Sequence, residues 1–234
     1  MGISIRPCES LHIAINSLYA YDQPRQRLLA SLRKALVPMG QVHVFLGGLD
    51  AGAATASGTV SASGTVWKRD EDGTRVYKVA HNSVDFTAMV HIVETPDVFR
   101  DVSQWFYMHD TAVVGAGFWP NITRWCSSLA TCALPLTRWA PSSSMGLYDA
   151  RFLAEQREQV LALKNTRGVP AERWKMRNLG WEDRLFKLCD AQSPVPIRRF
   201  TRQCWNATIG RRTCICSKLQ VHYSYRYIYL YISM

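Results

Sequence analysis

The chain has 234 residues, 47% of them hydrophobic, which is enough for one large domain with a sizeable core and excludes disorder throughout. Its net charge of +10 is uneven: residues 1–150 carry 12 basic and 12 acidic residues, whereas residues 151–234 carry 16 and 6. The body is electrically balanced, so any attraction to polyanions is expected in the last third.

A strand, a helix and a second strand are predicted at the beginning of the chain. Alternating apolar residues predict a strand from Leu11 that turns polar at Asn16 and Ser17. The segment 22–40 predicts a helix, because apolar residues recur at helical spacing until a proline and a glycine end the pattern. A second strand is predicted at 41–48. This order is typical of a crossover between parallel strands and indicates an α/β layer fold.

The alternation of predicted strands and helices continues after an insertion. Residues 51–74 contain ASGTV twice and consist mainly of small residues, which predicts a low-complexity surface insertion. A strand is predicted at 75–81, a helix at 82–95 and an aromatic strand within 101–115.

A last amphipathic helix is predicted from Tyr148, with three residues on its inner face: Leu153, Val160 and Leu163. Beyond it the composition turns basic and the periodicity fades. We therefore predict a single three-layer α/β domain with a mostly parallel central sheet over residues 1–165. Residues 166–234 are predicted to be an irregular, basic C-terminal extension, whose tyrosine-rich end also fits translated non-coding sequence or a shifted reading frame.

The sequence predicts a cytoplasmic protein. The best candidates for a membrane span among the uncharged runs, 35–49 and 125–137, are short and contain proline, and the first residues lack a signal-peptide pattern. Seven scattered cysteines, an odd number, favour mostly free thiols. Sequons at Asn121 and Asn206 leave the secretory pathway open.

One strand end carries the main functional signal. Residues 104–111, QWFYMHDT, run an apolar strand directly into His109 and Asp110. The order of predicted elements over roughly residues 9–165, together with this strand end, resembles the GT-A class of glycosyltransferases. In that class a D-x-D motif ends a central strand and holds the divalent metal that bridges the diphosphate of a nucleotide-sugar donor.

The resemblance implies transfer of a sugar from a nucleotide donor to an acceptor, with Mn²⁺ or Mg²⁺ held by Asp110 and His109. The placement agrees with the chemistry, because ligand crevices in α/β sheets lie at the carboxyl ends of the strands. A metal held there would stabilise the charge on the leaving diphosphate. The family pattern has two acids where this chain has one, and a histidine ligand favours Mn²⁺ over Mg²⁺.

The resemblance also implies roles for residues of the donor site. The loop after the first strand would line the base and ribose of the nucleotide, through Asn16, Ser17 and Tyr19. Asn82 and Asp85, before the aromatic strand, would approach the ribose or the sugar of the donor.

The acceptor side would lie at the loop 142–146, which contains Ser144 and Gly146, because a glycine lets the backbone come close to a sugar ring. An inverting transfer needs a general base near the acceptor, and Asp149 is the acid next to this loop. The donor sugar, the acceptor, the stereochemistry and the oligomeric state stay open at this point.

Each candidate also has a purely structural interpretation. Asp110 suits a turn cap, His109 a hydrogen-bonded buried histidine, and Asn82 and Asp85 suit the first turn of a helix. A non-catalytic scaffold with this fold is therefore one alternative. The other is a nucleic-acid or anionic-surface binder acting through residues 164–226, where arginines alternate with aromatic residues.

Overall fold

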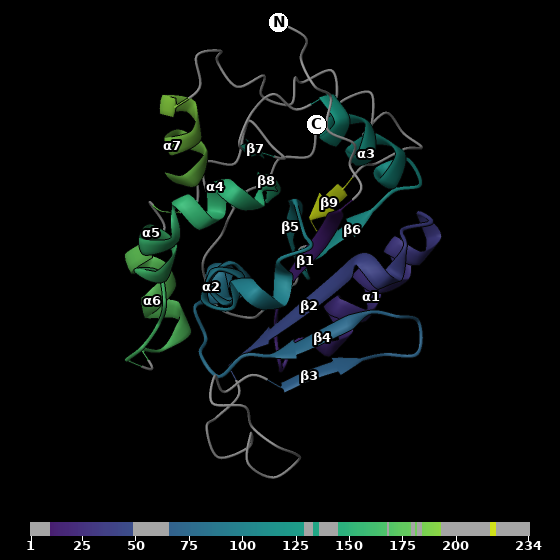
Figure 1. The fold of residues 1–234 in the computed structure, drawn as a ribbon. Helices are drawn as coiled ribbons and strands as arrows, with labels where there is room; N and C mark the ends of the chain where they lie inside the picture. Colours follow the sequence, from purple (N-terminus) through teal and green to yellow (C-terminus); the bar gives the residue numbers. More distant parts are fainter. Residues whose placement is uncertain are drawn as a thin grey trace, which may run out of the picture.

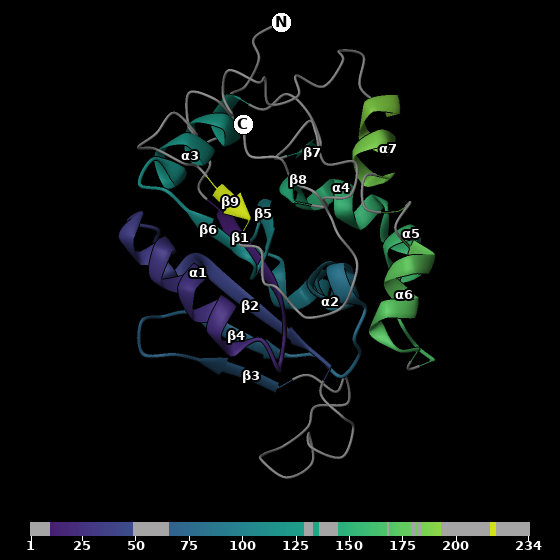
Figure 2. The same cartoon turned by 180° about the vertical axis from the view of Figure 1, so that it is seen from behind.

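A computed structural model of the protein describes residues 10–48, 66–128, 133–135, 145–167, 169–178, 181, 184–192 and 216–218. These residues form an α/β architecture in which helices lie on both faces of a central sheet (Figures 1 and 2). The predicted α/β class is confirmed.

The central sheet has seven strands in the described part of the chain, in the order β3-β4-β2-β1-β5-β8-β7. Its four middle strands are mutually parallel: β4 (Arg75–Lys78), β2 (Val42–Gly47), β1 (Leu11–Leu18) and β5 (Gln104–His109). The antiparallel strands are β3 (Val66–Arg69) at one edge and β8 (Gly146–Asp149) and β7 (Ala133–Pro135) at the other. A second sheet pairs β6 (Ala112–Val114) with β9 (Cys216–Lys218).

Three of the middle strands, β1, β2 and β5, are largely apolar because helices cover both faces of the sheet there. All six residues of β2 and five of the six residues of β5 are buried. α1 (Asp22–Lys34) lies against one face and α2 (Thr87–Glu94) against the other, as the two opposite views show. The expected layered arrangement around a largely parallel centre is therefore present.

The predicted helix at 82–95 begins later than expected. A 3-10 turn, η2 (Val84–Phe86), precedes α2, and Phe86 is the N-cap residue of the helix. Asn82 does not cap α2; its Oδ1 atom accepts a 3.0 Å hydrogen bond from the Val84 backbone N–H, a local turn contact.

The helix predicted from Tyr148 is interrupted. Tyr148 belongs to β8, and the helical segment divides at Gln156 into α4 (Ala150–Glu155) and α5 (Arg157–Leu161). The three residues predicted to face inward are buried: Leu153, Val160 and Leu163. α3 (Phe118–Ser128) and the short turns η1 (Met39–Gln41) and η3 (Pro96–Phe99) complete the body.

Two predicted boundaries are wrong. Residues 66–69 of the predicted insertion are the edge strand β3, while 51–65 lie outside the described residues. The domain also continues past residue 165, through α6 (Ala171–Asn178) and α7 (Arg184–Gln192). Apolar packing causes this, because Phe186 of α7 stacks on Tyr148 with ring centroids 4.9 Å apart.

Two cysteines depart from the expected free thiols, because Cys126 and Cys189 are disulfide-bonded. Disulfides persist mainly in oxidising compartments, so the cytoplasmic location stays a prediction. Among the described helices, none combines the length and hydropathy needed to cross a bilayer. Most of the basic tail lies outside the described residues.

Candidate functional site

The candidate site lies where β1 and β5 end side by side. The parallel register places Asn16 opposite His109, and the Asp110 backbone N–H donates a 3.1 Å hydrogen bond to the Asn16 carbonyl oxygen. This register brings Ser17 and Asp110 together at the carboxyl edge of the sheet, the edge where α/β folds form ligand crevices.

Asp110 is a buried carboxyl group, 4% exposed. Its Oδ2 atom accepts a 2.7 Å hydrogen bond from the Ser17 hydroxyl. Burial raises the pKa of Asp110 above its ordinary value, although the Ser17 hydrogen bond and the charge of Arg25 act in the opposite direction. The negative charge of Asp85 adds to the rise. A cation beside Asp110 would therefore favour its ionised form.

Asp85 supplies a second acid to the same site. Its Oδ1 atom lies 3.8 Å from His109 Nδ1, and its Oδ2 atom lies 3.0 Å from Lys175 Nζ. The Tyr107 hydroxyl donates a 2.6 Å hydrogen bond to the Asp85 carbonyl oxygen, which ties η2 to β5. The end of β5 carries one acid, Asp110, and η2 thus brings a second carboxylate near it.

Asn16 connects β1 to the start of α2. Its Nδ2 group donates to the Val84 carbonyl oxygen at 2.8 Å, and its Oδ1 atom accepts from the Ala88 N–H at 2.9 Å. Asn82 serves the neighbouring loop, because its carbonyl oxygen accepts a 3.0 Å hydrogen bond from Asn165 Nδ2. Both predicted donor-site amides therefore hold the backbone around the site.

Tyr19 is exposed beside the same edge. The residue is 54% exposed, and its backbone N–H donates a 3.0 Å hydrogen bond to the Gly47 carbonyl oxygen. Lys78 Nζ lies 6.0 Å from the centre of its ring. Gly48 follows with a φ of +84°, a conformation that glycine adopts without steric cost. An aromatic face and a lysine thus lie beside a close turn of backbone.

The predicted acceptor side lies only partly within the described residues. Gly146, the first residue of β8, pairs with Tyr107, two residues before His109, and Ser144 is outside the described residues. Asp149 pairs with Gln104 at the opposite end of β5, about 17 Å along the strand from His109 at the usual rise per residue.

Asp149 has a structural role at the start of α4. Its Oδ1 atom accepts hydrogen bonds from the backbone N–H groups of Arg151 and Phe152, at 2.8 and 3.3 Å, and so caps α4. The catalytic role of Asp149 stays a prediction, for a residue that caps α4 at the far end of β5 from His109.

Two basic residues of the site were not predicted. Arg25, in the first turns of α1, directs its guanidinium group to the Leu18 carbonyl oxygen at 3.3 Å and the Ser17 hydroxyl at 3.5 Å. Its position just after the first predicted strand could have indicated that it lies near the strand end. Lys175 has no such local signal, because it reaches Asp85 only through the packing of α6 on η2.

The fit of a metal can be judged from the side chains. Among the described residues no group of three or more His, Cys, Asp and Glu side chains has the arrangement of a metal site. Two carboxylates, Asp85 and Asp110, lie near the end of β5, and a site for Mg²⁺ or Mn²⁺ there stays a prediction. Such ions commonly use one or two carboxylates, with substrate phosphates and water as the remaining ligands.

Comparisons of the chain with known protein families, with curated proteins and with solved structures give no match.

Proposed function

We propose that the protein is a glycosyltransferase-like enzyme that transfers a sugar from a nucleoside-diphosphate donor in a metal-assisted reaction. The observation that supports this proposal is a pair of acids near the end of β5. Asp85 lies beside His109 and Lys175, and its charge raises the pKa of Asp110, the residue that follows β5. They lie at the carboxyl edge of the parallel strands, where a nucleotide donor is expected.

The charges of this site suit a diphosphate. The leaving diphosphate gains negative charge as the glycosidic bond breaks, and cationic groups that stabilise this charge accelerate the reaction. A bound Mg²⁺ or Mn²⁺ would supply Lewis-acid stabilisation of the diphosphate. Asp110 and Asp85 would hold the ion, and Lys175 Nζ, now 3.0 Å from Asp85, can move to a phosphate oxygen.

The neighbouring edge suits the rest of a nucleotide. The exposed ring of Tyr19 offers a face on which a base can stack. Lys78, beside that ring, adds positive charge toward the phosphates. The turn at Gly48 keeps side-chain bulk away from the backbone there. The donor would therefore lie along the ends of β1 and β2.

Calorimetric binding to the full chain tests the proposal. The probes are UDP, GDP and their sugar conjugates, each with and without Mn²⁺. Asp110→Asn and Asp85→Asn preserve side-chain size and remove one charge each, so both should abolish the effect of Mn²⁺ on binding.

Asp149→Asn is the matched control, because asparagine also caps helices and the residue lies at the other end of β5. It should bind as the wild-type protein does. Metal-independent binding, equal binding by the three variants, or no binding by the folded wild-type chain would refute the proposed function.

A further inference from the structure

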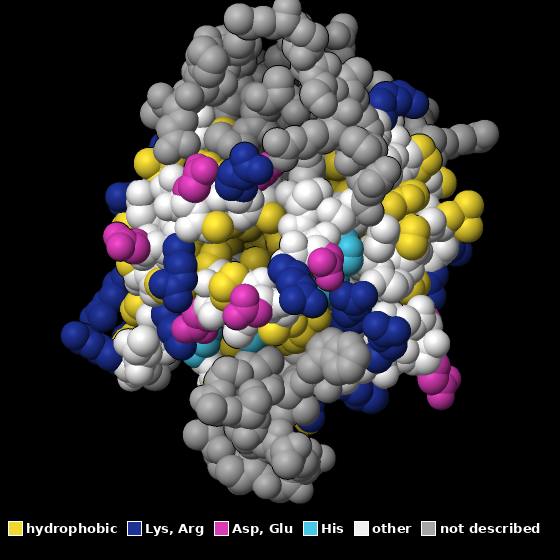
Figure 3. All heavy atoms as spheres, viewed as in Figure 1, with side chains coloured by type: hydrophobic (Ala, Val, Ile, Leu, Met, Phe, Trp, Pro, Cys, Tyr) yellow, Lys and Arg dark blue, Asp and Glu magenta, His cyan; other side chains and the backbone are white. Residues whose placement is uncertain are grey.

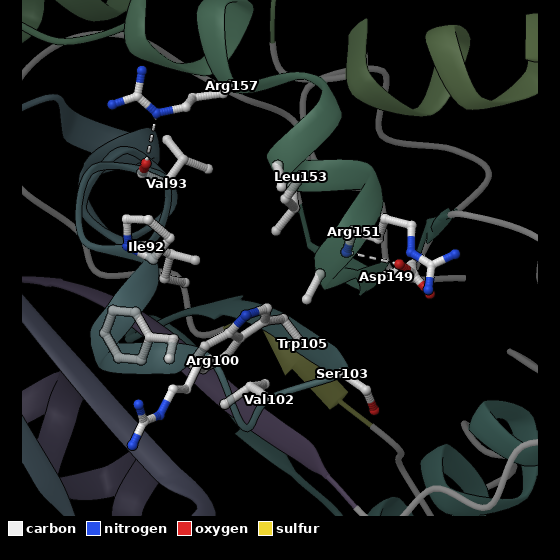
Figure 4. A pocket seen from close by; sticks show the side chains of 14 residues that line it. Ile92, Val93, Arg100, Val102, Ser103, Trp105, Asp149, Arg151, Leu153 and Arg157 are labelled. Carbon is white, nitrogen blue, oxygen red and sulfur yellow. Dashed lines mark hydrogen bonds between the residues drawn. The ribbon is translucent and has the colours of Figure 1, made fainter.

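A pocket lies at the amino-terminal end of β5, away from the strand end that leads into Asp110. Its volume is about 420 Å³, and it is bounded by the end of α2, by η3, by the start of β5 and by α4. Figure 3 shows a hollow of hydrophobic side chains with charged side chains around it, and Figure 4 shows the residues that line it. A cavity of this size is in the range of small-molecule sites.

The centre of this pocket is apolar. Ile92 and Val93 of α2 face Leu153 of α4 across the cavity, and the indole of Trp105 forms its floor (Figure 4). The indole nitrogen points toward the cavity (Figure 4). The centre of the pocket therefore offers mainly apolar contact.

Three arginines lie at the edge of the pocket, where Figure 3 also shows acidic side chains. Arg100, Arg151 and Arg157 line it from three sides and are exposed. None of the three forms an ion pair with another described residue, and Arg157 is oriented by a 3.2 Å hydrogen bond from its Nε to the Val93 carbonyl oxygen. The single carboxylate in the lining, Asp149, is occupied by the cap of α4.

We propose that this pocket binds a small anionic amphiphile of the fatty-acid class, with the apolar chain over Trp105 and the carboxylate at the arginines. Guanidinium groups bind carboxylates through two parallel hydrogen bonds, and unpaired ones at the mouth of an apolar cavity complement such a head group. Apolar side chains at the centre remove the chain of the ligand from water.

This site is separate from the proposed donor site. Trp105 and His109 lie at opposite ends of β5, and none of the pocket residues belongs to the cluster around Asp110. The ligand proposed for it therefore acts apart from sugar transfer, and its test stands whatever the outcome for the nucleotide.

Calorimetric titration of the full chain with decanoate, decanol and decylamine tests the proposal. We expect decanoate to bind at one site roughly tenfold more tightly than decanol, the size of effect that a charge-assisted hydrogen bond confers, and decylamine to bind more weakly still. Decylamine binding as tightly as decanoate would overturn the proposal, because it would reduce the site to unspecific apolar contact.

Two variants test whether the ligand binds in this pocket. Ala154→Trp, on the exposed side of α4 at the pocket wall, should fill the cavity and abolish decanoate binding. Arg157→Glu should weaken decanoate and strengthen decylamine, a gain that misfolding cannot produce. Arg27→Gln, at an exposed position of α1, is the matched control and should leave binding unchanged. Unchanged decanoate binding by Ala154→Trp would refute the site.

Discussion

The Ser17 hydroxyl donates a 2.7 Å hydrogen bond to Asp110 Oδ2, across 93 residues of sequence. Both residues are almost fully buried, so the bond joins the ends of β1 and β5 in a region with little water. A carboxylate in such a place depends on its donors, because the charged form loses hydration on burial.

Ser17→Ala should destabilise the protein by about 1–3 kcal/mol at neutral pH, since it leaves a buried carboxylate with one donor fewer. The loss should be smaller in the Asp110→Asn background, because a hydrogen bond to a neutral acceptor contributes less. Urea unfolding of the four proteins measures the coupling. Equal losses in both backgrounds would contradict it.

Lys175→Met should weaken binding of a nucleoside diphosphate roughly tenfold, because it removes a charge-assisted contact to phosphate. Its effect on unfolding free energy should stay below about 1 kcal/mol, since Lys175 is partly exposed and pairs with Asp85 at the surface. Calorimetry and urea unfolding provide the two readouts. Lys34→Met, an exposed lysine of α1, should change neither; a similar loss of binding there would indicate unspecific charge attraction.

Asp149→Ala should reduce stability by about 1 kcal/mol through loss of the α4 cap, whereas Asp149→Asn should be nearly neutral. Neither variant should change nucleotide binding or sugar transfer, because the residue lies at the far end of β5. Thermal unfolding and calorimetry check the two parts. Loss of transfer with retained stability in Asp149→Asn would instead support the catalytic role predicted for Asp149.

The stability of the protein should fall as the pH falls below about 6.5, the ordinary pKa of histidine. Burial lowers the pKa of His43 to about 2, and the nearby His12 adds to the effect. The unfolded chain therefore takes up a proton at this residue below about pH 6.5 while the folded chain does not, so the stabilisation is present above that pH and is lost as pH decreases.

Replacement of this residue tests the linkage. His43→Phe should reduce the slope of unfolding free energy against pH by about 1.4 kcal/mol per pH unit between about pH 4.5 and about pH 6, because one titrating group is gone. Tyr77→Phe removes the hydroxyl 3.1 Å from His43 Nδ1 and is the control: it should lower stability without changing that slope. Identical slopes for wild type and His43→Phe would exclude His43 as the source.

The local sequence pattern was sufficient to predict the strands at the centre of the sheet. The apolar runs of β1, β2 and β5 are visible in sequence because strands buried on both faces need continuous apolar residues. The same local signal located Asp110 at the end of β5, since the change from apolar to polar residues marks where a buried strand meets its edge.

Contacts between distant segments decided the rest. Asp85 meets His109 because η2 packs beside the end of β5, and Lys175 meets Asp85 because α6 packs on η2. Contacts between segments this far apart in the sequence have no local pattern. The direction of β8 assigned Asp149 to the opposite end of the sheet, because antiparallel pairing reverses which end a residue occupies. The sequence by itself determined the α/β class and the strand that ends in His109 and Asp110, through local hydrophobic periodicity. The tertiary structure decided which charged groups surround that end and where the apolar pocket lies, because both depend on how separate elements pack.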